Sequence, residues 1–332
     1  MTEGALFLRK TIEEKDWERV PVPPGFSDIK GRHIVAENGL GAYVVDGRPQ
    51  GDAKKATLIY PQWSDGTLHN PMSRRRAEVA AAVTKSLVVY VDNAGVELTR
   101  PPMDKNIRKA LWKGDFTPGA TQQWDAVGEA LDQYGLNFDA VSRVVGSSLG
   151  AHVAVAAAAT APGEVHLNEI HLLETAGLDK KKSLADFVLN FLMHGGDRSE
   201  EFVKTNPEWA KDLREVDGIK PLWKLAWQRP AGLLYYPMAI HRSDIAEVLI
   251  RTKDKKGSAI DGDTAIGVLY GTESQVSPRE QNEIFARRLA QSGFKNVVIF
   301  SAEGGVHASQ ENMGFWYKAL QYMDDWARKS NY

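Results

Sequence analysis

Short apolar runs alternate with longer segments of helical periodicity along most of the 332-residue chain. Runs rich in β-branched and aliphatic residues, bounded by polar or glycine-containing turns, are typical of strands. They predict strands at residues 33–37, 42–46, 57–60, 87–92, 140–146, 169–173, 265–270 and 296–301. The last six runs are predominantly apolar, as expected of parallel strands that are covered by helices on both faces.

Between these runs, apolar residues recur at the spacing of one helix face. This periodicity predicts helices at residues 71–84, 121–134, 149–160, 277–292 and 309–329. We expect Ser309 to be the N-cap of the last helix, because a serine side chain can accept a hydrogen bond from the first helical turn. Alternating strands and helices predict an α/β fold with a mostly parallel central sheet flanked by helices.

Residues 178–257 interrupt the alternation, because they contain aromatic, amphipathic stretches but no clear strand pattern. A segment of this length is too long for a loop and short for an independent domain. We therefore predict a helical lid, or cap, inserted into one α/β domain. Residues 1–177 would form the first part of that domain and residues 258–332 the second part.

The composition excludes several protein classes. Hydrophobic residues make up 43% and charged residues 25% of the chain, and 41 basic against 43 acidic residues give a net charge of −2. Disordered chains are less apolar, and nucleic-acid-binding proteins usually carry a basic excess, so we expect neither disorder nor a nucleic-acid partner. No apolar stretch approaches the roughly 18 residues of a membrane span, and the first residues do not resemble a signal peptide.

Cysteine is absent from the sequence. Disulfides, thiol catalysis and cysteine-containing metal sites are therefore excluded together. A chain without cysteine fits a reducing compartment, so we expect a cytoplasmic protein, and we leave open whether it forms a homodimer.

The motif with the clearest chemical meaning is Gly146-Ser147-Ser148-Leu149-Gly150, which has the form G-x-S-x-G. It follows the predicted strand at 140–146 and precedes an alanine-rich predicted helix. A sharp turn between strand and helix requires small residues two positions before and after the serine, and it exposes the serine hydroxyl. The following helix N-terminus directs N–H groups towards a developing oxyanion.

With this motif in place, the sequence resembles the α/β-hydrolase superfamily. The resemblance covers the order of the elements from about residue 30 to 328, including an insertion after the sixth core strand. It implies that Ser148 is the nucleophile and that Leu149 provides one oxyanion-hole N–H. A second N–H comes from the loop after the third core strand in this family, and Trp63 holds that position in Pro61-Gln62-Trp63.

A serine needs a general base, and histidine usually provides it. In the family pattern this histidine follows the last core strand and precedes the final helix. His307 matches, because it follows the predicted strand at 296–301 and the flexible pair Gly304-Gly305. His152 lies four residues after Ser148 on the same predicted helix, and we expect it to pack or to cap rather than to act as the base.

The sequence offers several residues for the carboxylate that orients the histidine. The family most often places an aspartate after the seventh strand, but the corresponding residue here is Ser274. Glu273, one residue earlier, is the first choice for the acid. Glu174, after the sixth strand, is the alternative, since the family contains variants with the acid there. An acid elsewhere, such as Glu303, or no acid at all also stays open.

The aromatic insertion suggests an apolar substrate. Trp223, Trp227 and Tyr235 are candidates for the wall of a hydrophobic substrate pocket. Alternatively, Trp209, Trp223 and Trp227 pack the insertion's own small core. No phosphate-binding loop, dinucleotide fingerprint or H-E-x-x-H motif is present, so neither a cofactor nor a metal is expected.

These features predict a serine hydrolase, of carboxylesterase type, that cleaves an ester of a hydrophobic small molecule. A thioester or an amide is a related choice of substrate. The same fold also hosts C–C bond hydrolases and cofactor-free haloperoxidases with the same catalytic residues. A third alternative is a hydrolase-like binding protein that has lost its acid, which Ser274 would indicate.

Overall fold

A computed structural model of the chain describes residues 7–49, 55–62, 70–95, 103–178, 183–186, 207–209 and 230–330. A twisted nine-stranded sheet forms its centre, in the order β1-β9-β8-β7-β6-β4-β5-β3-β2. The strands are β1 (Leu8–Ile12), β2 (Gly31–Val35), β3 (Gly41–Asp46), β4 (Ala56–Tyr60), β5 (Leu87–Val91), β6 (Val141–Ser147), β7 (Glu169–Leu173), β8 (Ala265–Gly271) and β9 (Val297–Ala302).

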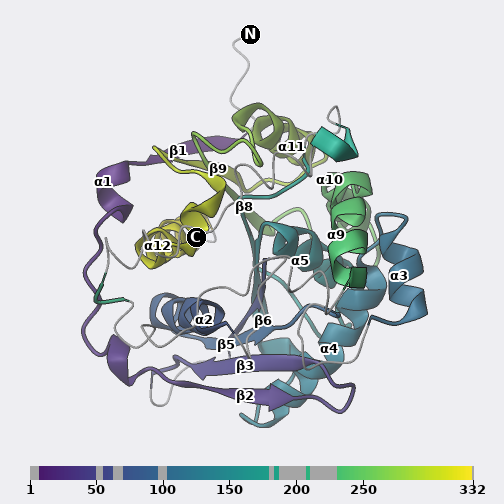
Figure 1. The fold of residues 1–332 in the computed structure, drawn as a ribbon, viewed down its shortest axis with the longest axis horizontal. Helices are drawn as coiled ribbons and strands as arrows, with labels where there is room; N and C mark the ends of the chain where they lie inside the picture. The colour runs from purple at the N-terminus through teal and green to yellow at the C-terminus, as the bar shows by residue number, and fades with distance from the viewer. Residues whose placement is uncertain are drawn as a thin grey trace.

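The sheet is parallel except at one end. β3 pairs antiparallel with both β2 and β5, whereas every other neighbouring pair is parallel. The six strands β4 to β9 are therefore parallel, and all residues of β4 to β8 are buried except Ser142, which is half-buried. This confirms the prediction of a mostly parallel sheet with helices on both of its faces (Figure 1).

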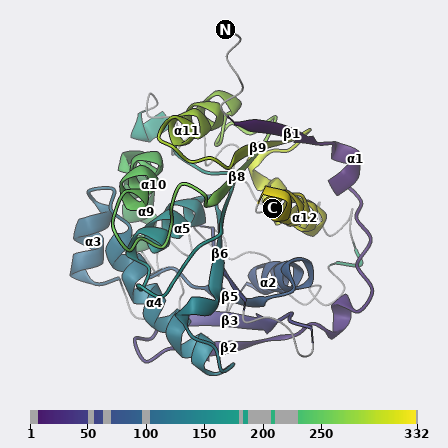
Figure 2. The same cartoon turned by 180° about the vertical axis from the view of Figure 1, so that it is seen from behind.

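Helices cover the sheet in two layers. α1, α2 and α12 lie on one face, and α3, α4, α5, α9, α10 and α11 lie on the other, as the views from front and back show (Figures 1 and 2). Their bounds are α1 (Glu14–Trp17), α2 (Pro71–Thr84), α3 (Lys105–Leu111), α4 (Thr117–Asp132), α5 (Leu149–Thr160), α9 (Pro230–Arg242), α10 (Ile245–Lys253), α11 (Arg279–Gln291) and α12 (Met313–Ser330). Short 3₁₀ helices are η1 (Phe26–Asp28), η2 (Phe138–Ala140) and η3 (His307–Glu311).

All eight predicted strands are present, and the structure adds β1, which the sequence patterns did not indicate. β1 is an edge strand that pairs only with β9, and its sequence carries Arg9 and Lys10 side by side. Charged residues protect exposed sheet edges from pairing with other chains, and they also hide the apolar alternation that identifies a strand.

The predicted start of the last helix is wrong. Ser309 lies inside η3, where its hydroxyl accepts a hydrogen bond from the Val306 N–H at 2.9 Å. α12 begins later, and Asn312 caps it, because Asn312 Oδ1 accepts from the Gly314 N–H at 2.8 Å and from the Phe315 N–H at 3.3 Å. The chain thus turns twice between β9 and α12, which places His307 in a short helix of its own.

The described parts of residues 178–257 lie against the body of the protein. α10 packs on α5 and α11 and buries Ile245, Ala246 and Leu249. No strand occurs in those parts of the segment that the structure describes. The division of the chain into a domain and an inserted lid stays a prediction.

The contacts of Trp209 with described residues lie outside the insertion, and its packing against the rest of residues 178–257 stays untested. Its ring lies 5.0 Å from Phe26 and 5.8 Å from Tyr317, centroid to centroid, and its indole N–H donates to the Val20 carbonyl at 2.6 Å. It therefore belongs to the apolar core between α12 and η1. Trp223 and Trp227 lie outside the described residues.

A buried ionic cluster connects the sheet to α12. Arg143 on β6 and Glu169 on β7 are register partners, and the Arg143 guanidinium contacts the Glu169 carboxylate at 2.6 and 2.9 Å. Arg143 also binds Asp324 of α12, which Arg328 contacts from the other side. Burial opposes the ionisation of Glu169, but the charge of Arg143 and hydrogen bonds from His171 and Arg143 outweigh it and lower the pKa of Glu169 to about 2.

We expect Glu169→Gln to reduce the free energy of unfolding by about 3 kcal/mol at pH 7, since a carboxyl whose pKa is lowered stabilises the folded state above its ordinary pKa. The difference from the wild type should shrink as the pH falls from about 4.5 to about 2, where the wild-type carboxyl becomes protonated. Urea unfolding followed by tryptophan fluorescence at several pH values measures both effects.

Asp263→Asn is the matched control for this experiment. Asp263 pairs with Lys295 at 2.8 Å, but both side chains are exposed, and exposed pairs contribute about 1 kcal/mol or less. Equal losses in the two variants, or a Glu169→Gln loss that does not depend on pH, would contradict the role assigned to the buried cluster.

Candidate active site

Ser148 occupies a sharp turn between β6 and α5. Its backbone has φ 55° and ψ −116°, a strained conformation for a residue with a side chain. The two flanking glycines are required by sterics. A Cβ on Gly150 would lie 2.0 Å from the Tyr60 carbonyl oxygen, and one on Gly146 would lie 2.3 Å from the Gly150 carbonyl oxygen. The turn therefore matches the G-x-S-x-G interpretation in its geometry.

Hydrogen bonds between strand ends align the loops that surround Ser148. The Ser148 N–H donates to the Leu173 carbonyl at the end of β7, at 2.9 Å. The Glu174 N–H in turn donates to Leu269 of β8 at 2.7 Å, and the Thr272 N–H donates to Ala302 of β9 at 2.9 Å. Because parallel strands end at the same edge of a sheet, these bonds bring four consecutive loops together.

His307 reaches Ser148 from the loop after β9. Its Nε2 lies 3.1 Å from Ser148 Oγ, and the two side chains are 3% and 2% exposed. The approach of this loop depends on glycine, since a Cβ on Gly271 would lie 2.1 Å from the Gly305 carbonyl oxygen. Two backbones thus pass at close range, and His307 is held directly over the turn at Ser148.

The carboxylate beside His307 belongs to Glu174. Glu174 Oε2 lies 3.2 Å from His307 Nδ1, and the Glu174 side chain is fully buried. Ser274 Oγ donates to the same oxygen at 2.7 Å, and the Gly271 N–H donates to Oε1. Several donors compensate the cost of burying this carboxylate, and together they fix its orientation.

Glu273, the first choice for the acid, does not occupy this position. Its side chain is exposed, while its backbone N–H donates to the Gly305 carbonyl at 2.9 Å. The turn after β8 instead directs Ser274 inwards, to the Glu174 carboxylate. Glu303 is likewise exposed. The residue in the usual acid position is thus a hydrogen-bond donor to an acid that comes from the neighbouring strand.

Glu174 reaches the ring because its own backbone is unusual. Its φ is +49°, so a residue with a long side chain adopts the left-handed region directly after β7. This conformation is uncommon outside glycine, asparagine and aspartate and marks a position that the surroundings determine. Ser148 and Glu174 therefore follow adjacent strands in similar sharp turns.

His152 has a structural position, as the sequence predicts. Its Nε2 lies 2.8 Å from the Ala176 carbonyl oxygen, and its ring lies 5.3 Å from that of Phe116. The contact with Ala176 holds the loop that carries Glu174 against the first turn of α5.

One of the two predicted oxyanion donors can be located. Leu149 is the first residue of α5, where the backbone N–H has no acceptor within the helix. Trp63 lies outside the described residues, but the loop leading to it starts at Pro61. Asn93 Nδ2 donates to the Pro61 carbonyl at 3.2 Å, and Gln123 Nε2 donates to the Asp92 carbonyl at 3.0 Å. Side chains following β5 thus support the loop that follows β4.

Of the three predicted pocket residues, only Tyr235 is described. It is half-buried on α9, and its ring lies 6.2 Å from that of Trp112, at the end of α3. The next residue, Tyr236, faces the body of the protein and donates to the Ala94 carbonyl at 2.7 Å. The substrate-pocket role of Tyr235 stays a prediction.

Two buried polar residues beside the site were missed in the sequence. Ser147 precedes Ser148, and Gln310 lies three residues after His307 on η3. The Ser147 hydroxyl donates to Gln310 Oε1, and Gln310 Nε2 lies 3.4 Å from His307 Nε2. The i to i+3 spacing of His307 and Gln310 would have indicated this neighbour only if η3 had been predicted.

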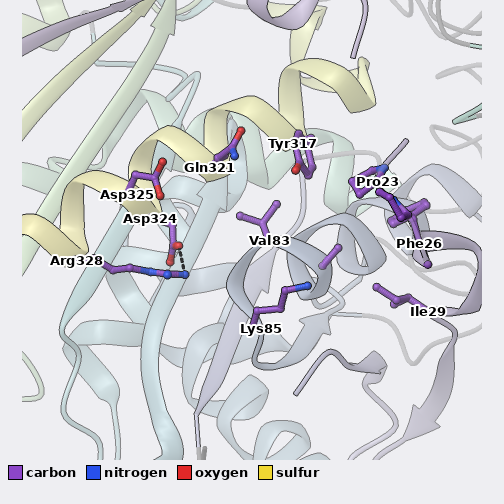
Figure 3. A pocket seen from close by; sticks show the side chains of 13 residues that line it. Pro23, Phe26, Ile29, Val83, Lys85, Tyr317, Gln321, Asp324, Asp325 and Arg328 are labelled. Atoms are coloured by element: carbon purple, nitrogen blue, oxygen red, sulfur yellow. Dashed lines mark ion pairs between the residues drawn. The ribbon is translucent and has the colours of Figure 1, made fainter. Parts of the chain in front are cut away.

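A cavity of about 430 Å³ lies between the end of α2, α12 and the segment around η1 (Figure 3). Its lining includes Phe26, Val83, Lys85, Tyr317 and Asp324. Val83 and Lys85 flank the end of α2 just before β5 begins, whereas Ser148 follows the end of β6, and both strands run parallel to β4. The cavity is therefore separate from the site at Ser148.

In the described ranges, no group of three His, Asp or Glu side chains is placed as metal ligands would be. None of the helices that are described combines the length and the apolar character needed to cross a membrane.

Comparison with known proteins shows similarity in structure only. No family model matches the sequence, and no curated protein sequence matches it significantly. Carboxyl esterase 2 of the mycorrhizal fungus Tuber melanosporum superposes with a TM-score of 0.53 and 14% identity, over 95% of this chain and 94% of that one.

Two further solved structures give a similar result. The esterase Pf2001 of Pyrococcus furiosus has a TM-score of 0.53 and 13% identity, over 94% of this chain and 97% of that one. The N-formylmaleamic acid deformylase of Pseudomonas putida S16 has a TM-score of 0.50 and 14% identity, over 88% of this chain and 99% of that one. Together with the strand order and the turn at Ser148, these similarities identify the fold of the chain as the α/β-hydrolase fold.

Proposed function

We propose that the protein is a serine hydrolase that cleaves an ester of a hydrophobic small molecule through an acyl-enzyme on Ser148. The observation that carries this proposal is the line of hydrogen bonds from Ser148 Oγ to His307 Nε2, and from His307 Nδ1 to the Glu174 carboxylate, at 3.1 and 3.2 Å. A nucleophile, a base and an orienting acid in this order are the parts that acyl transfer requires.

In this mechanism Ser148 Oγ attacks the carbonyl carbon of the ester while His307 Nε2 accepts the hydroxyl proton. The N–H of Leu149, and by family position that of Trp63, stabilise the oxyanion of the tetrahedral intermediate. The intermediate expels the alcohol, which takes the proton from His307, and leaves an acyl-serine. Water then attacks the acyl group with His307 again as base, which releases the carboxylic acid and restores Ser148.

Glu174 acts on the orientation of the histidine. A carboxylate at Nδ1 selects the tautomer in which Nδ1 carries the proton and Nε2 has the free lone pair, and it stabilises the imidazolium that forms during attack. The hydrogen bonds from Ser274 and Gly271 support this role, because they hold the carboxylate with Oε2 towards the ring. The proposed catalytic residues are therefore Ser148, His307 and Glu174, and Glu273 is no longer proposed.

An ester is proposed because an alcohol leaving group needs less assistance than an amine. Esterases are among the proteins with a similar fold, which supports hydrolysis without specifying the substrate. C–C bond hydrolases and haloperoxidases would use the same three residues, and none of the contacts described above favours them over ester hydrolysis. The alternative of a binding protein without an acid has lost its main argument, since Ser274 is paired with Glu174.

We expect a fluorophosphonate probe to add once to the wild-type protein and not to Ser148→Ala, because the probe reacts with a serine that a neighbouring base activates. Intact-mass spectrometry measures the adduct. Ser142→Ala, on the same strand, is the control and should be labelled like the wild type. Unlabelled wild-type protein, or a Ser148→Ala variant that still gains the adduct, would exclude the proposed nucleophile.

We expect Glu174→Gln to lower kcat for a p-nitrophenyl ester by about 10³-fold or more, since an amide at this position no longer selects the correct histidine tautomer. Glu273→Gln is the matched control and should stay within about twofold of the wild type, because exposed loop charges away from the reaction contribute little. Steady-state kinetics at a fixed pH compare the two. The reverse ranking would return the acid role to Glu273.

A further inference from the structure

Gln310 and Ser147 form a buried polar pair that the proposed mechanism does not use. Their side chains are 1% and 2% exposed, so neither is solvated by bulk water. A buried amide retains a stability cost unless its donors and acceptor are satisfied. The hydrogen-bond partners of the Gln310 amide therefore indicate its role.

The amide has a defined orientation. Gln310 Oε1 accepts a hydrogen bond from the Ser147 hydroxyl, which turns the NH₂ group towards His307. Gln310 Nε2 lies 3.4 Å from His307 Nε2, and Ser148 Oγ lies 3.1 Å from the same ring nitrogen. Gln310 is three residues after His307 on η3, and residues at this spacing eclipse each other in a 3₁₀ helix.

An amide N–H is a donor only, so it can bond to His307 Nε2 only while that nitrogen has a lone pair, which the amide shares with the Ser148 hydroxyl. The lone pair exists in the neutral ring whose Nδ1–H faces Glu174, and it disappears when the ring becomes an imidazolium. A hydrogen bond made only to the neutral form favours that form. Gln310 and Glu174 thus act on the ring in opposite directions.

We propose that Gln310 is a positioning residue that keeps His307 in its neutral, proton-accepting form, and that Ser147 sets the orientation of the amide. This inference rests on the proposed function, in which the neutral ring is the active base. Gln310 does not contact the scissile bond in the proposed mechanism, so its effect passes through His307. The effect of Gln310 should therefore appear in the pH dependence of the activity rather than in the rate at high pH.

The effect of Gln310 on the protonation of His307 can be compared with that of the carboxylates near the ring. Among the described contacts of His307, the hydrogen bond from an ionisable group is that of Glu174, at the end of β7. Glu273 lies on the neighbouring turn after β8, and Glu14 of α1 lies against Gly304, but both side chains are exposed. Exposed charges act weakly on a buried ring, because solvent screens them.

The test is an NMR titration of the His307 ring nitrogens in resting, full-length protein labelled with ¹⁵N-histidine. The signals are assigned by their loss in His307→Ala. Gln310→Met keeps the length of the side chain and removes the donor. We expect the titration midpoint of His307 to move to higher pH by about half a unit, which corresponds to about 0.7 kcal/mol. Ser147→Ala should move it in the same direction by less.

Ser309→Ala is the matched control, since it removes the hydrogen bond to the Val306 N–H within η3 without touching the ring. Its midpoint should stay within about 0.1 unit of the wild type. Should Gln310→Met fail to fold, Gln310→Glu tests the same contact, because a carboxylate accepts from the imidazolium and should raise the midpoint by about one unit or more. An unchanged midpoint in the Gln310 variant, or an equal shift in Ser309→Ala, would overturn the proposal.

A kinetic measurement separates this inference from the proposed function. In Gln310→Met, the acid limb of the pH profile of kcat/KM for a p-nitrophenyl ester should shift to higher pH by the same half unit, or about 0.5. The plateau at higher pH should change less than about threefold. If the wild type has no Ser148-dependent turnover, the proposed function fails, yet the NMR titration still decides the role of Gln310. If turnover is present and neither the limb nor the titration moves, only the inference about Gln310 fails.

Discussion

The site depends on hydrogen bonds that tie the ends of four parallel strands to one another. The loops after β6, β7 and β8 begin with Ser148, Glu174 and Thr272. Each of these residues donates its backbone N–H to a carbonyl at or near the end of the next strand. Ser148 and Glu174 both take positive φ values at these points, which directs their side chains out of the sheet edge towards the same histidine. The strain at two residues is therefore supported by the most deeply buried part of the fold.

Two buried carboxylates, Glu169 and Glu174, are each compensated by hydrogen-bond donors. Glu169 is buried with Arg143 and His171, and these partners keep it ionised inside the helix and sheet layers. Glu174 is buried with Ser274, Gly271 and His307 as its described partners, and no arginine or lysine is among them. A buried carboxylate in such surroundings can stabilise a transient imidazolium, whereas the Arg143 cluster connects the sheet to α12.

Much of the fold and half of the site could be predicted from the sequence. Apolar runs identify buried parallel strands because both faces must be apolar, and two glycines around a serine identify the sharp turn because Gly146 and Gly150 leave no room for a Cβ. The edge strand β1 could not be found, since its charges hide the alternation. The acid could not be chosen either, because Glu174 and Glu273 both follow strands in loops and only the three-dimensional direction of each turn separates them.

The proposed mechanism depends most on the hydrogen bond between His307 Nδ1–H and Glu174, which proton NMR can observe directly. A proton shared between an imidazole nitrogen and a buried carboxylate is strongly deshielded and protected from exchange with water. We expect a low-field signal, coupled to a ring nitrogen of His307, that persists in Glu273→Gln and vanishes in Glu174→Gln. A signal that persists in Glu174→Gln, or that Glu273→Gln removes, would exclude this hydrogen bond.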